Sequence, residues 1–295
     1  MNLFKFKKLF TLTTLLGLIV LTLTACTQTP KKNTKMTIVT TTNVYADIAK
    51  NVVGKYGTAE AIIKNPNSDP HDFEPTTNDA KKLASADIIV ANGLGYDSWM
   101  NKLASSVDKK PVLVGEELLG LKKGANPHIW FDLAMPKKYV DDLVQRLSKK
   151  DPTHASYYRK KGQAYLAKIK DIQQNVNQLE QHHSKPVYVS EPVFDYALQA
   201  GNFKIANQDF EKAIQNNTDP SPATVQQMTA GIKKHKIAFF VVNSQTSSTT
   251  VNNFVRLAQK EKIPVLKVRE TIPVKTTYLD WMTDNYQSLA KIAKQ

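Results

Sequence analysis

Two histidines and two glutamates in this sequence have the residue types and placement of a divalent-metal site. His71 lies in the segment DPHDFEP and His128 in the segment NPHIW, each directly after a proline. Glu191 and Glu270 lie just beyond two predicted strands. Two carboxylates would neutralise a divalent cation, and two imidazoles would bind it once both are unprotonated. Each residue taken singly also fits a solvated surface position, so the hypothesis depends on all four meeting in space.

An α/β fold is expected to bring them together. The predicted strands are residues 36–41, 59–64, 87–91, 112–114, 187–190, 203–206, 237–242 and 264–268. They alternate with helical patterns, which indicates mostly parallel sheets covered by helices on both faces. Ligands of such sheets bind beyond the carboxyl ends of the strands. The loops that carry the four candidates follow strands in this way.

One long helix is predicted between two groups of strands, over residues 151–183. Asp151 and Pro152 favour a helix start there. Apolar or small residues then recur at steps of three and four: Tyr158, Gly162, Tyr165, Ile169, Ile172, Val176 and Leu179. At 1.5 Å per residue the helix would be about 45 Å long. We interpret it as a rigid helix that joins an N-terminal lobe (36–150) to a C-terminal lobe (184–295), the alternative being a three-heptad coiled coil.

The first 25 residues have the pattern of a secretory signal. Lys5, Lys7 and Lys8 precede an apolar run of about 14 residues, shorter than the ~20 of a membrane-spanning helix. The run ends in Leu-Thr-Ala followed by Cys26, the only cysteine of the chain. This ending resembles the bacterial lipobox, which implies that Cys26 is acylated. Residues 26–35 are polar and are expected to form a flexible tether.

Composition narrows the possible functions. The chain has 295 residues, 41% of them hydrophobic, and a net charge of +14. Its basic residues are scattered rather than gathered in a stripe with aromatic residues, which argues against nucleic-acid binding. A basic surface beside an anionic membrane is a sufficient account of the charge.

From residue 35 onward the sequence resembles the metal-binding lipoproteins of bacterial ABC importers for manganese, zinc and iron, the cluster A-I (cluster 9) solute-binding proteins. The matching stretches are DPHDFEPTTNDAKKLASADIIVANGLGYDSWM (69–100), NPHIWFDL (126–133), VYVSEPVFDYALQAG (187–201) and TYLDWMTDN (277–285). The resemblance implies two α/β lobes joined by the long helix.

The resemblance also implies the ligands, with His71 first, His128 second and Glu191 third. The fourth ligand of the family is normally an aspartate before a segment with a tyrosine and a methionine. Alignment on Tyr278 and Met282 places Glu270 there, which departs from the family pattern, and Asp280 is the less favoured alternative.

Other polar residues have simpler interpretations. The histidines His154, His182, His183 and His235 are expected to be solvated. The tryptophans Trp99, Trp130 and Trp281 are expected to pack. Glu74 fits either a bond to a ligand histidine or a salt bridge, and the roles of Asp72 and Asp132 stay open.

The expected function is binding, without catalysis. The resemblance implies a monomeric lipoprotein at the outer face of the cytoplasmic membrane that captures a divalent transition metal and delivers it to an ABC permease. Manganese is favoured by the two carboxylates, with zinc or iron as alternatives. A metallohydrolase would need an open coordination position and a general base. An adhesin is the third reading, with no specific adhesive feature in the sequence.

Overall fold

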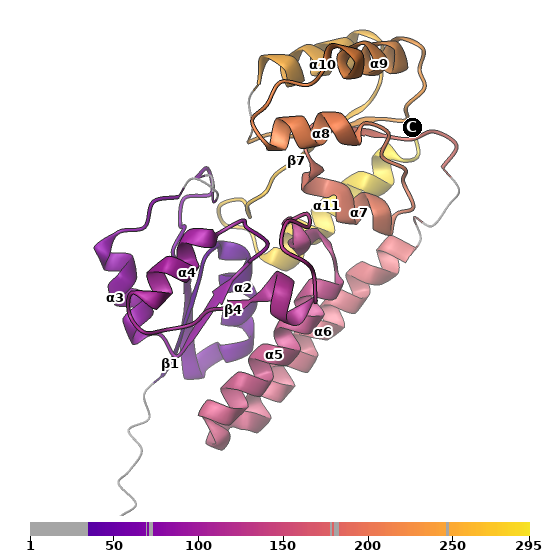
Figure 1. Ribbon diagram of the computed structural model, residues 1–295. Helices are drawn as coiled ribbons and strands as arrows, with labels where there is room; N and C mark the ends of the chain where they lie inside the picture. Colours follow the sequence, from indigo (N-terminus) through magenta and orange to yellow (C-terminus); the bar gives the residue numbers. More distant parts are fainter. Residues whose placement is uncertain (1–34, 69, 71–72, 178, 180–182, 246–247) are drawn as a thin grey trace, which may run out of the picture. The chain divides into compact units, whose positions relative to one another are not determined.

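Four parallel strands form the first sheet of the protein (Figure 1). The computed structural model describes residues 35–68, 70, 73–177, 179, 183–245 and 248–295. The strands are β1 (Met36–Thr40), β2 (Gly57–Ala61), β3 (Ile88–Ala91) and β4 (Val112–Leu113), in the order β2-β1-β3-β4. Ile38 of β1 lies opposite Ile88 of β3. The central strands β1 and β3 are almost entirely buried and rich in isoleucine and valine, as is typical of a parallel sheet covered on both faces.

Three parallel strands form the second sheet, β5 (Tyr188–Val189), β6 (Phe240–Asn243) and β7 (Val265–Val268), in the order β5-β6-β7. The prediction of a strand over residues 203–206 is wrong. In that range the structure has a single isolated bridge, between Ile205 and Val187, in place of a strand. Asn207 explains this end of pairing. Its side chain accepts from Val189 N at 3.0 Å and donates to Val189 O at 2.7 Å, where a further strand residue would otherwise pair.

Helices cover both sheets. In the first half of the chain they are α2 (Asn43–Val53), α3 (Thr77–Ser85), α4 (Ser98–Ser105), α5 (Ala134–Lys150) and α6 (Ala155–Asn177). In the second half they are α7 (Asp195–Ala200), α8 (Gln208–Gln215), α9 (Pro222–Lys233), α10 (Thr249–Lys260) and α11 (Tyr278–Ile292). Short 3-10 or π turns are η1 (Gly54–Tyr56), η2 (Val114–Leu118), η3 (Ile129–Phe131), η4 (Pro152–His154) and η5 (Pro192–Phe194).

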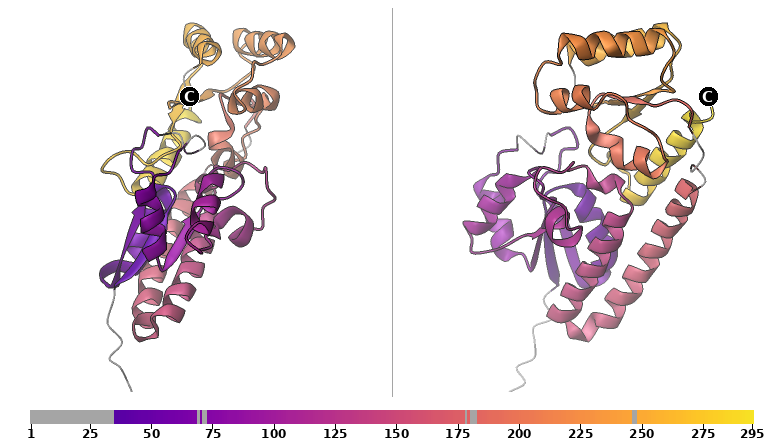
Figure 2. Two further views of the ribbon diagram at one scale, coloured as in Figure 1. Left: turned by 60° about the vertical axis from the view of Figure 1, so that its left-hand side comes forward. Right: turned by 45° about the vertical axis from the view of Figure 1, so that its right-hand side comes forward.

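The long helix α6 forms an antiparallel hairpin with α5 (Figure 2). The turn η4 precedes it, and Asp151 Oδ2 accepts from Tyr158 Oη at 2.7 Å. The predicted apolar stripe is buried against α5, α2 and α11 of the same chain, which rules out the coiled-coil alternative. A Cβ added at Gly162 would lie 2.7 Å from Val144 Cγ2, so this glycine permits the close approach of α5 and α6. The described helix ends at Asn177, before the predicted end near residue 182, and residues 178 and 180–182 lie outside the described residues.

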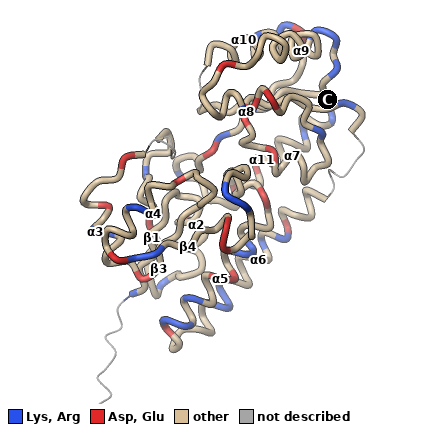
Figure 3. Tube along the Cα trace, viewed as in Figure 1, with Lys and Arg blue, Asp and Glu red and all other residues tan. Residues whose placement is uncertain are grey.

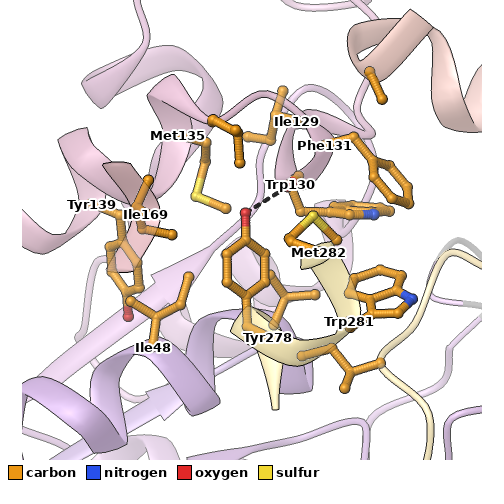
Figure 4. Packing of buried hydrophobic residues seen from close by; sticks show 14 of the residues in the cluster. Ile48, Ile129, Trp130, Phe131, Met135, Tyr139, Ile169, Tyr278, Trp281 and Met282 are labelled. Carbon is orange, nitrogen blue, oxygen red and sulfur yellow. Dashed lines mark hydrogen bonds between the residues drawn. The ribbon is translucent and has the colours of Figure 1, made fainter. Parts of the chain in front are cut away.

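The closing helix α11 ties the two halves of the chain into one core. Its first residue, Tyr278, is fully buried among residues of the first half (Figure 4). The Tyr278 hydroxyl donates to Trp130 O at 2.7 Å, and the Tyr286 hydroxyl donates to Phe131 O at the same distance. One continuous cluster of buried side chains therefore extends from Met36 to Ile292. Such shared packing favours small movements of loops over a wide hinge opening.

Charge and hydropathy add two observations on the surface. Basic and acidic residues are interspersed along α5 (Figure 3), where Arg146 pairs with Asp142 at 2.6 Å. Within the described ranges, none of the helices has the length and apolar character needed to cross a membrane.

Candidate metal centre

Three of the four predicted metal ligands lie at the carboxyl ends of strands or in the loops beyond them, close to one another. His128 lies in the loop before η3, Glu191 directly before η5, and Glu270 two residues after β7. His71, and with it the predicted lipidation residue Cys26, lies outside the described residues. The structure therefore describes most of the predicted site but not its first ligand.

The His128 ring is held by an amide that also fixes its tautomer. His128 is 2% exposed, and its Nδ1 lies 2.7 Å from Asn126 Oδ1. The Asn126 amide nitrogen donates to Pro192 O at 2.7 Å, which identifies Oδ1 as the acceptor that faces the histidine. In neutral His128 the proton is then on Nδ1, and Nε2 carries the lone pair.

The loop before His128 is anchored from the first sheet. Asn92, the first residue after β3, donates to Pro127 O at 3.1 Å and accepts a short hydrogen bond from the Tyr45 hydroxyl. Asp97 in turn accepts from the backbone of Asn92 at 2.7 Å. Burial raises the pKa of Asp97, whereas the hydrogen bonds that its carboxylate accepts from the backbone N–H groups of Asn92 and Gly93 lower it. His128 thus follows a segment fixed by completely buried polar contacts.

Asn243 joins the two predicted carboxylate ligands. It is the last residue of β6, and its amide nitrogen donates to Glu191 Oε2 and to Glu270 Oε1, both at 2.8 Å. Its own backbone N–H donates to Ser190 Oγ at 3.0 Å, so the side chain projects from a fixed strand end. Since carboxylates repel each other, one donor amide between them stabilises their close approach.

Glu270 faces His128 and Tyr96 from the opposite sheet. Its Oε2 lies 3.9 Å from His128 Nε2 and 3.5 Å from the Tyr96 hydroxyl. Tyr96 is 1% exposed and its ring packs against the ring of Trp130. His128 Nε2 therefore faces the carboxylate of Glu270, which follows a strand of the second sheet. A cation between the two groups would stabilise this arrangement.

Metal ligation by these residues stays a prediction. Among the residues that the structure describes, no group of three or more His, Cys, Asp or Glu side chains meets the geometry of a metal site. Asn243 lies between the two glutamates. The remaining predicted ligand, His71, lies outside the described residues.

The less favoured candidates have structural roles. Asp280 lies in the first turn of α11, where its backbone N–H donates to the N-cap residue Thr277 and its Oδ2 accepts from the Thr277 hydroxyl at 2.7 Å. Asp132 accepts from Ala134 N at 2.8 Å near the start of α5. Glu74 is exposed, and Asp72 lies outside the described residues.

Two histidines expected to be solvated are packed instead. His154 stacks on Tyr56 at 3.6 Å between ring centroids and bonds Asp151, and His183 stacks on Phe203 at the same separation. Both lie beside aromatic residues distant in sequence, which the local polar pattern did not show. His235 is exposed, and His182 lies outside the described residues.

Sequence reasoning missed the amides around the site, chiefly Asn243, Asn126 and Gln245. Asn243 follows the predicted strand 237–242 directly, so the rule that selected the glutamates would also have selected it. Asn126 stands in the quoted NPHIW segment. A search restricted to charged and imidazole side chains overlooks such residues because an amide neither titrates nor is a usual transition-metal ligand.

The fold is that of a two-lobed α/β protein, and this polar cluster brings together residues from both parallel sheets. A sequence profile of the family described as zinc-uptake complex component A, periplasmic, matches residues 38–292, and the chain belongs to this family. The metal ABC transporter substrate-binding lipoprotein SloC of Streptococcus mutans is 29% identical over 256 residues, which cover 80% of this chain and 82% of the relative. The manganese ABC transporter substrate-binding lipoprotein PsaA of Streptococcus pneumoniae is 26% identical over 281 residues, 88% of each chain.

Solved structures show the same fold. The periplasmic zinc-binding protein TroA of Treponema pallidum superimposes with a TM-score of 0.71 at 22% identity, covering 88% of this chain and 99% of that chain. The resemblance and the α/β fold predicted from the sequence are thereby confirmed. The family consists of metal-binding substrate-binding proteins of ABC transporters and not of enzymes, as expected. The metallohydrolase and adhesin alternatives receive no support from these relatives.

Proposed function

We propose that this protein captures a divalent transition metal, with manganese favoured, and delivers it to an ABC importer permease. The observation that carries the proposal is the convergence of Glu191 and Glu270 on Asn243, with His128 facing Glu270 from the first half of the chain. His71 is proposed as the remaining ligand. Four protein ligands would enclose the ion and leave no coordination position for a substrate, as suits a carrier rather than a catalyst.

The choice of metal follows from the donor atoms. The two carboxylates are hard oxygen ligands, and manganese and iron bind such ligands more readily than they bind soft thiolates. A site of nitrogen and oxygen donors nevertheless binds zinc more tightly than manganese in the usual order of affinities. The relatives include proteins named for manganese and for zinc. Manganese is therefore proposed as the transported ion and zinc as a tight competitor, with iron as the third candidate.

A test should separate affinity from transport. The metal content of the protein purified from its native host would be measured, together with uptake of manganese, zinc and iron in a deletion strain. We expect manganese in the purified protein and reduced manganese uptake after deletion. Protein that carries only zinc, with manganese uptake unchanged, would refute the manganese assignment. A purified protein that binds none of the three ions in titration calorimetry would refute the function itself.

We further propose that a lipid on Cys26 holds the protein at the outer face of the membrane, and that the protein is a monomer there. The basis is the signal pattern of residues 1–25 and the relatives SloC and PsaA, which are named as lipoproteins. Replacing Cys26 with alanine should leave metal affinity unchanged, because Cys26 is not among the proposed ligands, and should shift the protein away from the membrane fraction. Mass spectrometry of the wild-type N-terminus would detect the lipid. Full membrane retention of the variant, with no lipid on the wild type, would contradict the proposal.

A further inference from the structure

The carbonyl of Pro66 is a meeting point of the two lobes. Pro66 lies in the loop after β2, on the chain segment that leads to His71. Three donors from the second half of the chain reach its oxygen: Gln245 Nε2 at 2.9 Å, Arg269 Nη2 at 3.3 Å, and the Thr271 hydroxyl through a short hydrogen bond. Arg269 Nη2 also donates to Asn67 Oδ1 at 3.0 Å. We name these contacts the Pro66 latch.

Gln245 links the latch to Glu270. Its Oε1 accepts from Glu270 N at 2.7 Å and from Thr271 N at 3.2 Å. Its Nε2 donates to Pro66 O and to Thr271 Oγ1, the latter at 3.1 Å. One side-chain amide therefore fixes the backbone of Glu270 and bonds the opposite lobe at the same time.

The latch is a specific contact within a protected environment. Thr271 is 3% exposed with the latch in place, and without Pro66 O its hydroxyl would keep, as a donor, only the longer contact to Gln245 Oε1, at 3.3 Å. An unmade buried hydrogen bond is costly, so separation of the two loops and loss of the latch must occur together. Any opening of the site on this side therefore has to break these bonds.

We propose that Gln245 and Thr271 are positioning residues that hold the site closed over the bound metal, so that the Pro66 latch sets the rate at which metal leaves. The inference rests on the proposed metal-binding function and adds the part of the structure that governs release. The ligands act on the ion directly, whereas these two residues act through the backbone of Glu270 and the loop of Pro66. Weakening the latch raises the population of the open state, which speeds dissociation and leaves entry of the metal nearly unchanged.

Thr271→Val is the most direct test, because valine has nearly the shape of threonine and replaces its hydroxyl with a methyl group, which neither donates to Pro66 O nor fits at hydrogen-bond distance from it. We expect dissociation of Mn²⁺ and of Zn²⁺ into excess chelator to become about fivefold faster, the effect of one hydrogen bond. The association rate should stay within about twofold. Stopped-flow emission of Trp130, whose ring centroid lies 5.3 Å from that of His128, provides the signal. Thr271→Ser restores the hydroxyl and should restore slow dissociation.

Two further variants separate the latch from general loosening. Asn67→Ala removes the acceptor of one Arg269 hydrogen bond and leaves the contacts of Glu270 unchanged. Because Asn67 is exposed, we expect dissociation to become at most about twofold faster. Ser244→Ala is the matched control, since the Ser244 hydroxyl bonds Val268 O at 2.9 Å in the same loop pair but not Pro66. It should leave the dissociation rate unchanged.

Hydrogen exchange gives a readout that does not depend on metal. The N–H groups of Glu270 and Thr271 should exchange about fivefold faster in Thr271→Val than in Ser244→Ala, because Gln245 then loses one of its partners. Dissociation and exchange rates that match the wild type in Thr271→Val would overturn the latch. A wild-type protein that binds neither ion would overturn the proposed function, and the exchange comparison would still decide whether the latch exists.

Discussion

Replacing Glu270 with alanine is expected to weaken binding of Mn²⁺ and Zn²⁺ by at least about 100-fold. Removal of a group that only supports a ligand typically costs about 10- to 100-fold in metal affinity, and loss of a ligand should cost no less. Glu270 is also the carboxylate that faces His128 Nε2, at 3.9 Å, so its loss would remove charge from the centre of the site. Titration calorimetry against both ions measures the change, and urea unfolding confirms that the variant is folded.

Asp280 provides the control for this experiment, because it is the alternative fourth ligand. Its carboxylate bonds Thr277 in the first turn of α11 and has a structural explanation there. Asp280→Ala should leave metal affinity within about twofold and lower the free energy of unfolding by about 1 kcal/mol or less, because it removes the acceptor of the Thr277 hydroxyl while the N-cap Thr277 remains. Metal binding that survives in Glu270→Ala and is lost in Asp280→Ala would exchange the two assignments.

Periodic patterns of residues predicted most of the fold. The stripe from Tyr158 to Val176 has a helical period and is buried as predicted. The apolar run 237–242 contains most of the buried strand β6. The strand predicted over residues 203–206 failed because a side chain, that of Asn207, takes over the pairing of Val189. A side-chain contact of this kind depends on tertiary structure and leaves no periodic signal.

The site was predictable to the extent that it follows strand ends. Glu191 and Glu270 were selected because each lies just beyond a strand, and the structure brings both to Asn243. The amides that orient these groups were not selected. Their function depends on partners far away in sequence, such as Pro192 for Asn126 and Pro66 for Gln245, and only the folded chain brings these together.

Two carboxylates in the second lobe are buried away from the predicted metal centre and carry the second large expected effect. Asp195 is 8% exposed and Glu211 is 3% exposed, at the starts of α7 and α8. Among the described residues, Asp195 Oδ1 and Glu211 Oε2 have no hydrogen-bond partner. Burial raises the pKa of Asp195 to about 7. Burial and the charge of Asp195 raise the pKa of Glu211 to about 8, against a smaller opposing effect of Lys212.

These raised pKa values predict a protein that loses stability as the pH rises. The unfolded chain releases both protons near the ordinary values of 3.8 and 4.5, whereas the folded protein keeps them until about pH 7 and 8. Folding therefore takes up protons in this window, and the free energy of unfolding falls from about pH 4 until both groups are ionised above pH 8. At about 1.4 kcal/mol per unit of pKa shift, the two shifts set an upper bound of about 9 kcal/mol on this loss. Relaxation of the protein and entry of water around the two charges reduce the expected loss to on the order of 3 kcal/mol.

Glu211→Gln should abolish much of this loss, because glutamine has the shape of the protonated carboxyl and does not ionise. We expect its free energy of unfolding in urea to match the wild type within about 1 kcal/mol at pH 5 and to exceed it by on the order of 2 kcal/mol at pH 9. The pH dependence that remains should be that of Asp195, whose pKa is raised by burial to about 7, and it should be complete near that pH. Asp209→Asn, at an exposed carboxylate of the same helix, should keep the wild-type profile. Parallel pH profiles for Glu211→Gln and the wild type from pH 5 to pH 9 would show that Glu211 is already ionised in the folded protein, and that a cation or a proton donor compensates its charge.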